Sequence, residues 1–197
     1  FSGGMGTVDD PYLISTVQDL NRIGQNPRLM KVHFRLIDDI DLTGVDLFII
    51  GSRSYPYAGV FDGSGHTISN FRCTSTRTRR NGIGLFGYVD DPNAQIRNLG
   101  VIYPHVNAGS DVGALVGSLK AGTITNCYVQ GGTVSGLKNV GGLVGSSDGG
   151  AISACRSSAS VSGSSGGWKY RGIGGLVGNN FSQLFNCHAT GNVLGDR

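Results

Sequence analysis

The chain has 197 residues, a formal net charge of +3 and only 15% charged residues, and 34 of its residues are glycine. Glycine makes up about 7% of an average chain, so this composition first raises the question of disorder. Apolar residues that recur at fixed intervals exclude a disordered linker, and so small a positive charge does not by itself indicate a nucleic-acid binder. No apolar run approaches the roughly 20 residues that cross a bilayer.

The first recognisable element is a short amphipathic helix over residues 15–24. Val17, Leu20 and Ile23 share one helical face. Ser15 and Gln18 have the spacing of a capping box, and Gly24 is the expected end of the helix. We expect this helix to cover the open end of a repeat array, because terminal repeats need a polar outer face.

From residue 40 onward the sequence repeats. Apolar anchors follow one another at four equal steps and then at one longer last step, at Ile40, Ile68, Ile96, Ile124, Ile152 and Leu184. The later anchors follow glycine-rich blocks at 83–87, 112–117, 140–145 and 173–178. Each repeat contains two or three short apolar runs between turns and leaves no room for a helix, which argues against leucine-rich repeats and propeller blades.

A repeat of about 28 residues fits one turn of a parallel β-helix. The sequence therefore predicts an all-β solenoid of about six to seven rungs with a short N-terminal capping helix. We expect one domain over residues 1–197, with the cap and first rung at 1–39 and the repeats at 40–197. Residues 191–194 read as the start of another coil, so we expect the chain to be a piece of a longer protein.

Two residue types have predicted structural roles at the corners of the coil. An asparagine ladder is expected, interrupted once by Ala154, with left-handed backbone angles at Asn70, Asn98, Asn126 and Asn186. Positive φ angles are expected at the glycines that close each block, Gly87, Gly117, Gly145 and Gly178. The glycines are interpreted as corners rather than as a phosphate-binding loop, because no crossover helix follows them.

Three of the four cysteines are expected to stack inside the core. Cys127, Cys155 and Cys187 occupy the repeat position of Leu99 and Phe71, and Cys73 corresponds to Val101. Parallel Cβ vectors on stacked rungs make poor disulfide geometry, so free thiols are favoured over disulfides. No Cys-x-x-Cys pair occurs, and we expect no metal and no cofactor.

The acidic residues Asp38, Asp39, Asp41 and Asp62 have two readings. Clustered carboxylates serve as acid/base pairs or calcium ligands in β-helical enzymes. Turn chemistry is the favoured reading, with residues 62–65 as a tight loop. No lysine or arginine stands at a repeat-equivalent position beside these acids, so we assign no catalytic residue.

Two surface segments are the candidate ligand-binding sites. One is an arginine-rich loop, whose guanidinium groups suit sulfate, phosphate or uronate groups, at Arg72, Arg77, Arg79 and Arg80. The other is the insertion that lengthens the last repeat and presents Trp168, Lys169, Tyr170 and Arg171. Aromatic rings stack on sugars and are frequent in binding hot spots. A solvated loop and packing of Trp168 on a neighbouring rung are the structural alternatives.

The glycine-rich blocks resemble the GLUG repeat, above all Gly-Gly-Leu-Val-Gly at 141–145 and 174–178. Residues 6–15, 39–42 and 61–68 look like the segments that precede such repeats. The resemblance implies bacterial secreted or surface-anchored proteins, adhesin-like proteins and the non-catalytic part of immunoglobulin A metallopeptidases among them, and it supplies no catalytic residue.

The expected function is that of a non-catalytic β-helical module, a rigid spacer or a surface for adhesion or glycan binding. Part of a β-helical polysaccharide lyase or glycosidase is the alternative. We expect an extracellular or bacterial cell-surface location. A host or microbial glycan or another protein is the expected partner, together with further domains of the same polypeptide, and neither nucleic acid nor a membrane span is expected.

Overall fold

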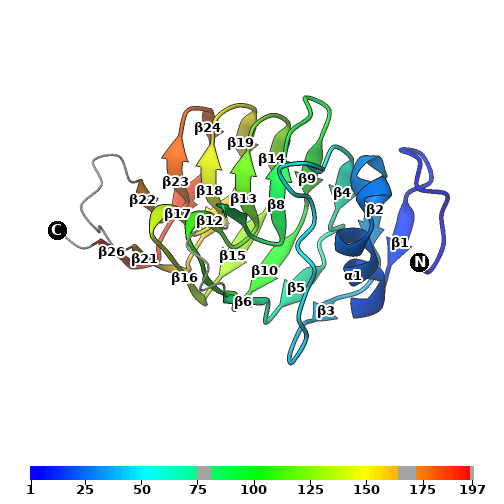
Figure 1. The fold of residues 1–197 in the computed structure, drawn as a ribbon, viewed down its shortest axis with the longest axis horizontal. Coiled ribbons are helices and arrows are strands. Elements are labelled where there is room, and N and C mark those ends of the chain that lie inside the picture. Colours follow the sequence, from blue (N-terminus) through cyan, green and yellow to red (C-terminus); the bar gives the residue numbers. More distant parts are fainter. Residues whose placement is uncertain (75–80, 164–171, 196–197) are drawn as a thin grey trace.

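The fold is a coil of short parallel strands that advances from the N-terminal to the C-terminal end of the molecule (Figure 1). The computed structural model describes residues 1–74, 81–163 and 172–195. Every named strand pair in these ranges is parallel, and like positions of successive turns pair with one another, as at Ile96 and Ile124. The predicted parallel β-helix is confirmed.

Two sheets follow one another at the start of each turn. Sheet A is formed, in spatial order, by β1 (Tyr12–Ile14), β2 (Phe34–Leu36), β4 (Val60–Asp62), β9 (Gln95–Arg97), β14 (Thr123–Thr125), β19 (Ala151–Ser153) and β24 (Gln183–Phe185). Sheet B is formed by β3 (Ile40–Asp41), β5 (Thr67–Ser69), β10 (Gly100–Ile102), β15 (Tyr128–Gln130), β20 (Arg156–Ser157) and β25 (His188–Ala189).

Three further sheets complete the turn. Sheet D is formed by β6 (Arg72–Thr74), β11 (His105–Asn107), β16 (Thr133–Gly136), β21 (Ser160–Gly163) and β26 (Val193–Gly195). Sheet E is formed by β7 (Asn81–Ile83), β12 (Ser110–Gly113), β17 (Lys138–Gly141) and β22 (Ile173–Gly174). Sheet C is formed by β8 (Phe86–Val89), β13 (Val116–Leu119), β18 (Val144–Ser147) and β23 (Val177–Asn180).

The solenoid has about five turns, because sheet D has five strands and sheets E and C have four each. The predicted count of six to seven rungs is too high. The two extra strands of sheet A, β1 and β2, do not belong to complete turns. They pair with each other, and β2 also pairs with β4, at the end of the molecule where the helix lies (Figure 1).

The predicted frame is right from Ile96 onward and right for Ile40 and Ile68, which pair with each other, but it is wrong at the step from Ile68 to Ile96. Ile96, Ile124 and Ile152 stack on successive turns at equal steps, as expected. The partner of Ile96 on the preceding turn is Phe61, which makes this step longer than the later ones. Ile68 lies in sheet B instead, opposite Val101. The first full turn has longer loops, so the regular step backwards from Ile96 falls on the wrong sheet.

The N-terminal end is covered by α1 (Val17–Gln25), as predicted, and by the short 3₁₀ helix η1 (Pro27–Lys31). Leu20 and Ile23 are fully buried against the first strands. The N-cap is Thr16 rather than Ser15, and its hydroxyl accepts a hydrogen bond from the Asp19 backbone N–H. Gly24 does not end the helix; its missing side chain lets the helix touch the Phe48 backbone.

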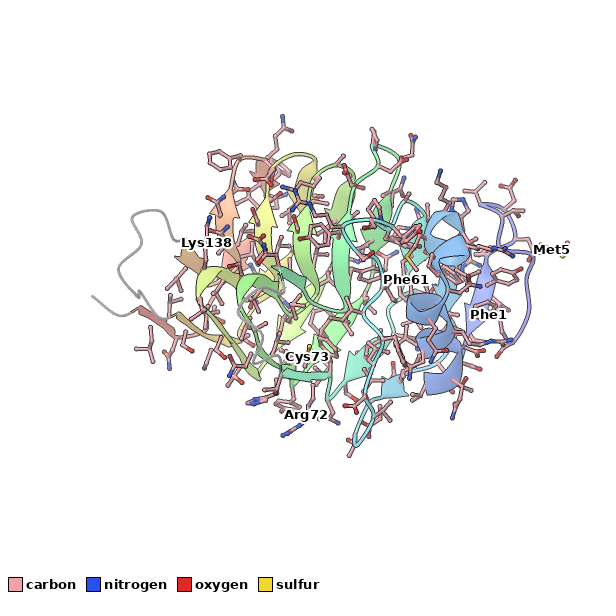
Figure 2. All side chains as sticks on the ribbon, viewed as in Figure 1. Phe1, Met5, Phe61, Arg72, Cys73 and Lys138 are labelled. Carbon is pink, nitrogen blue, oxygen red and sulfur yellow. The ribbon has the colours of Figure 1, made fainter. Side chains whose placement is uncertain are left out.

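The core begins with aromatic rings and continues with aliphatic side chains and cysteines. Near the capped end, Phe34, Phe61 and Phe86 pack in sequence, with ring centroids 6.3 and 5.2 Å apart. Figure 2 shows Phe61 inside the coil. Further along, the buried positions hold smaller residues such as Val101 and Val129, so the interior is one continuous apolar column.

The block glycines allow two sheets to approach each other and do not form corners. Gly145 lies inside β18, and a Cβ on it would overlap the backbone of Asp111 and Val112 in β12 of the preceding turn. Comparable overlaps occur at Gly87, Gly117 and Gly178, and none of these glycines has a positive φ angle. The predicted left-handed turns are wrong, because the constraint at these positions is the closeness of sheets C and E.

The last turn is uncovered in the described part of the chain. Leu184 continues the buried column of Ile96 and Ile152 but is 43% exposed, and Leu194 is 70% exposed. β22 to β26 each form the terminal strand of their sheet. Residues 172–195 contain no Asp, Glu, Lys or Arg, so these edges lack the charges that usually protect an exposed strand.

Candidate functional site

Most of the predicted ligand-binding residues lie outside the described ranges: Arg77, Arg79, Arg80, Trp168, Lys169, Tyr170 and Arg171. Arg72 is described. It is exposed on β6, on the outside of sheet D, beside His105 of the next turn (Figure 2). Ligand binding by these two segments stays a prediction.

Both carboxylate oxygens of Asp62 accept hydrogen bonds from neighbouring residues. One oxygen accepts hydrogen bonds from the Ser64 backbone N–H at 2.9 Å and from Asn98 Nδ2 at 3.1 Å. The other accepts from Arg97 Nε at 3.0 Å. Burial alone would raise the pKa of Asp62, but these hydrogen bonds and the Arg97 charge outweigh it and lower that pKa. The sequence did not reveal Arg97 as the partner of Asp62, because the two residues lie opposite each other only in the strand register that the structure has.

Asp39 and Asp41 are engaged at a different corner of the coil. Asp41 accepts hydrogen bonds from Asn70 Nδ2 at 2.8 Å and from the Thr43 hydroxyl. Asp39 accepts from the Thr67 backbone N–H at 2.7 Å. The hydrogen bonds lower the pKa of both carboxyls, the one from Asn70 being the largest effect at Asp41 and the one from Thr67 at Asp39. These contacts support turn chemistry as the role of the acidic residues.

The asparagine ladder exists, but it has fewer members than predicted. Asn126 Nδ2 donates to Asn98 Oδ1 at 2.9 Å, and both residues have left-handed φ angles of 52° and 53°. Ala154 and Asn186 share this corner conformation, each with a φ of 52°. Asn70 belongs to a separate corner, where it pairs with Asp41.

Each amide ladder starts at an aspartate on its N-terminal side, a feature that the sequence reading missed. Asp62 precedes Asn98, and Asp41 precedes Asn70. A third pair joins Asn139 Nδ2 to Asp111 Oδ1 at 2.7 Å, with left-handed φ angles at both residues. An Asp one turn before an Asn at a corner position is the signal that would have found these pairs.

The stacked thiols form a structural column. Cys127 and Cys155 are buried one above the other, and their sulfurs contact backbone carbonyl oxygens, Ile96 and Ile124 respectively, on the preceding turn. Burial raises the pKa of Cys127 well above its ordinary value. Cys73 lies opposite Val106 rather than in the predicted column. No cysteine in the described ranges forms a disulfide.

The described ranges contain neither a metal-binding cluster nor a membrane-spanning helix. There, no three His, Cys, Asp or Glu side chains gather in an arrangement that would hold a metal ion. The same residues include no helix with the length and apolar character that a membrane crossing requires.

A surface hollow on sheet B brings together side chains suited to binding. Its volume is about 260 Å³, and its polar lining comes from three successive turns, with Tyr128, Gln130, Arg156, Ser158, His188 and Thr190. The Arg156 guanidinium lies 4.4 Å from the centre of the Tyr128 ring. Two other hollows are larger. One, of about 370 Å³, is lined by Ile49, Gly51, Ser52, Arg53, Asn81, Gly82, Ile83 and Tyr88. The other, of about 420 Å³, is lined by Asn107, Ala108, Ser135, Gly136, Leu137, Ser162, Gly163 and Leu194 and has no charged residue.

Comparison with known proteins agrees with the glycine pattern and the coil. Residues 170–194 match the GLUG motif. The last turn of this chain thus carries a GLUG motif. The GLUG resemblance is therefore confirmed, with the match falling on the block at 174–178, and the matched segment includes β22 to β25 and the first two residues of β26.

Two longer proteins are similar in sequence to this chain. Halomucin from Haloquadratum walsbyi is 36% identical over 154 residues, which cover 72% of this chain and 2% of halomucin. A protein named as a Gly-rich membrane protein, from Evansella cellulosilytica, is 36% identical over 139 residues, which cover 66% of this chain and 16% of that protein. The chain thus spans only a small part of these relatives.

A solved structure has the same fold. It is a protein from Bacteroides ovatus described as an immunoglobulin A1 protease, with a TM-score of 0.74 and 24% sequence identity. The match covers 99% of this chain and 70% of that one. At this identity, the comparison extends to the fold and to nothing finer.

Proposed function

We propose that this GLUG solenoid is a rigid spacer module of a secreted or cell-surface protein. The observation that carries the proposal is the in-register stacking of about five turns on one continuous apolar column. Each turn contacts mainly its neighbours, so such a solenoid sets a distance along its axis, and adding turns lengthens it without changing the cross-section.

The uncovered last turn supports a place within a longer array. Its strand edges carry no charge to prevent pairing, and the apolar column is open at Leu184 and Val193. The motif match falls on this turn, so its sequence is that of an ordinary repeat rather than of a polar terminal cap. Another parallel coil in the same register would cover both the edges and the column.

Duplication of one turn tests the spacer function. Residues 124–151 form one complete turn between equivalent positions. Adding four copies of this segment is expected to lengthen the particle by about 19 Å, at roughly 4.8 Å per turn, with an unchanged cross-section. Small-angle X-ray scattering measures both quantities. A lengthened chain with an unchanged maximum dimension, or with a wider cross-section, would refute a solenoid that grows along its axis.

Adhesion or glycan binding through the two predicted loops is a second proposed role of the same module. The arginine-rich loop begins at Arg72, which is exposed on sheet D. A glycan array with the wild type, with Trp168→Ala and with Arg72→Gln tests it. Loss of a glycan signal in either variant supports that loop, and unchanged signals in both remove the two loops from the proposal.

A further inference from the structure

The outer face of sheet B carries a column of side chains that follow one another on successive turns. Gly100 pairs with Tyr128, Tyr128 with Arg156, and Arg156 with His188, each on the next turn of the coil. Because strands stack in register, these positions lie in a straight line along the solenoid axis. A small residue, an aromatic ring and two basic side chains thus follow one another on one face.

Tyr128 holds the arginine in place. Its ring lies over Gly100, where a Cβ would overlap the ring atoms, so the missing side chain lets the ring lie flat against the sheet. On the C-terminal side, the Arg156 guanidinium stands 4.4 Å from the ring centre. Cation–π contact of this kind orients the guanidinium without using its N–H groups. Those N–H groups stay available for an acceptor.

Arg156 has no carboxylate partner in the described part of the chain. The ion pairs found there use other cations: the N-terminus, Arg22, His66, Arg97 and Lys120. The four strands of sheet B from β10 to β25, with their flanks at residues 99–104, 127–132, 155–160 and 187–192, contain no Asp or Glu. Arg156 is therefore a fixed positive charge without a neighbouring negative one on its own sheet face.

Polar groups surround this charge in the hollow of about 260 Å³. His188 lies one turn beyond Arg156, and Gln130 and Thr190 occupy the neighbouring outward positions. The Ser158 hydroxyl accepts from the Gly131 backbone N–H at 3.0 Å, which leaves its own hydrogen free to donate. Guanidinium, amide, imidazole and hydroxyl donors converging without an acid are the groups that bind carboxylate or sulfate.

We propose that this hollow binds the anionic groups, carboxylate or sulfate, of an acidic polysaccharide, with Arg156 as the principal contact. Tyr128 and Gly100 position the guanidinium. A linear polyanion running along the solenoid suits the geometry, because like outward positions repeat at every turn, about 4.8 Å apart. The inference does not depend on the spacer role, since it concerns a single face of three turns.

Binding to immobilised polysaccharides tests the proposal. The probes are dextran sulfate and polygalacturonate, with neutral dextran as the uncharged control. We expect the wild-type chain to bind at least one polyanion and not dextran, with an affinity that falls as salt is added. Arg156→Gln is expected to weaken binding about tenfold, the loss of one charge-assisted contact, and Arg156→Lys to weaken it less. The two polyanions distinguish sulfate from carboxylate as the recognised group.

Arg22→Gln is the matched control. Arg22 also lies over an aromatic ring, 5.2 Å from the centre of Phe1, but it has a carboxylate partner in Asp19 at 3.9 Å. This variant is expected to bind like the wild type. Circular dichroism and thermal unfolding confirm that each variant is folded before its affinity is measured.

Three outcomes would overturn the proposal. They are the absence of binding to both polyanions, equal binding to neutral dextran, and Arg156→Gln binding as tightly as the wild type. A further variant with Arg77, Arg79 and Arg80 changed to Gln shows where binding occurs in the last case. Chemical-shift changes at the Arg156 side-chain Nε–H during titration with sulfated oligosaccharide supply a direct readout, and unchanged shifts there count against the site.

Discussion

Filling the gap in the asparagine ladder is expected to stabilise the chain. Ala154 interrupts the column between Asn126 and Asn186, and its backbone has a left-handed φ of 52°. Ala in this conformation costs roughly 1–2 kcal/mol, a penalty that Asn largely avoids through local hydrogen bonding. Ala154 is exposed, so an amide side chain has room at this corner. The change Ala154→Asn therefore removes strain without disturbing the core.

The magnitude follows from the geometry of the existing ladder. Asn126 Nδ2 reaches Asn98 Oδ1 at 2.9 Å across one turn. An amide at position 154 would donate to Asn126 and accept from Asn186 in the same way. Each such hydrogen bond adds about 0.5–1.5 kcal/mol, and fixing the exposed side chain costs up to about 1 kcal/mol. With the relief of strain included, the net gain in the free energy of unfolding is about 1–2 kcal/mol.

Urea denaturation and thermal unfolding measure this gain. For a chain of this size, about 1 kcal/mol corresponds to a rise in Tm of about 2–4 °C. Ala154→Gly is the control, because it relieves the backbone strain without adding an amide, and its gain is expected to be smaller since glycine loses more entropy on folding. If Ala154→Asn is no more stable than Ala154→Gly, the amide ladder contributes nothing, and the reasoning is refuted.

Three further predictions test the packing, the acid response and the thiol column. Gly145→Ala is expected to lower the free energy of unfolding by about 3 kcal/mol or more, because its Cβ would overlap the β12 backbone. The control Gly44→Ala has open space around it and is expected to lose only about 1 kcal/mol, from its positive φ. Equal losses in urea denaturation would contradict the close approach of the two sheets. The pKa of Asp62 is lower in the folded chain than its ordinary value of 3.8, so its contribution to stability is complete above that value and is lost as the pH falls through the lowered pKa. Asp62→Asn should therefore lose less Tm than the wild type between about pH 5 and pH 2. A variant whose Tm falls with pH as the wild type's does would show that the carboxylate is not stabilising. The Cys127 thiol, buried and with a raised pKa, is expected to react with a thiol-specific disulfide reagent only as fast as the chain unfolds, and rapid reaction in native buffer would show that the column is open to solvent.

Several features of the fold were predictable because they depend on local patterning. The regular step that joins Ile96, Ile124 and Ile152 shows in the printed sequence, since each turn must place an apolar residue at the same point of the core. The capping helix was predictable from the spacing of Leu20 and Ile23. The left-handed corner at Asn98 was also predictable. Two nearby residues must both face the core, which a regular strand does not allow at their spacing, and an Asn between them accepts the left-handed bend that resolves the conflict.

The errors share one cause, which is that a sequence does not show which strand is the neighbour of which. Ile68 lies one regular step before Ile96, but longer loops in the first turn place it opposite Val101. Arg97 and Asp62 were not recognised as a pair for the same reason. The role of Gly145 was also missed, because the backbone that excludes a side chain there belongs to β12, on the preceding turn.

The sequence by itself determined that the chain coils with a repeating core, that a helix closes one end, and which motif its glycines form, because all three depend on periodicity along the chain. The tertiary structure alone decided the register of the first turn, the aspartates that begin each amide ladder, and the column in which Tyr128 orients Arg156. These depend on side chains that meet across turns of unequal length, and loop lengths set such meetings only after the strands have paired.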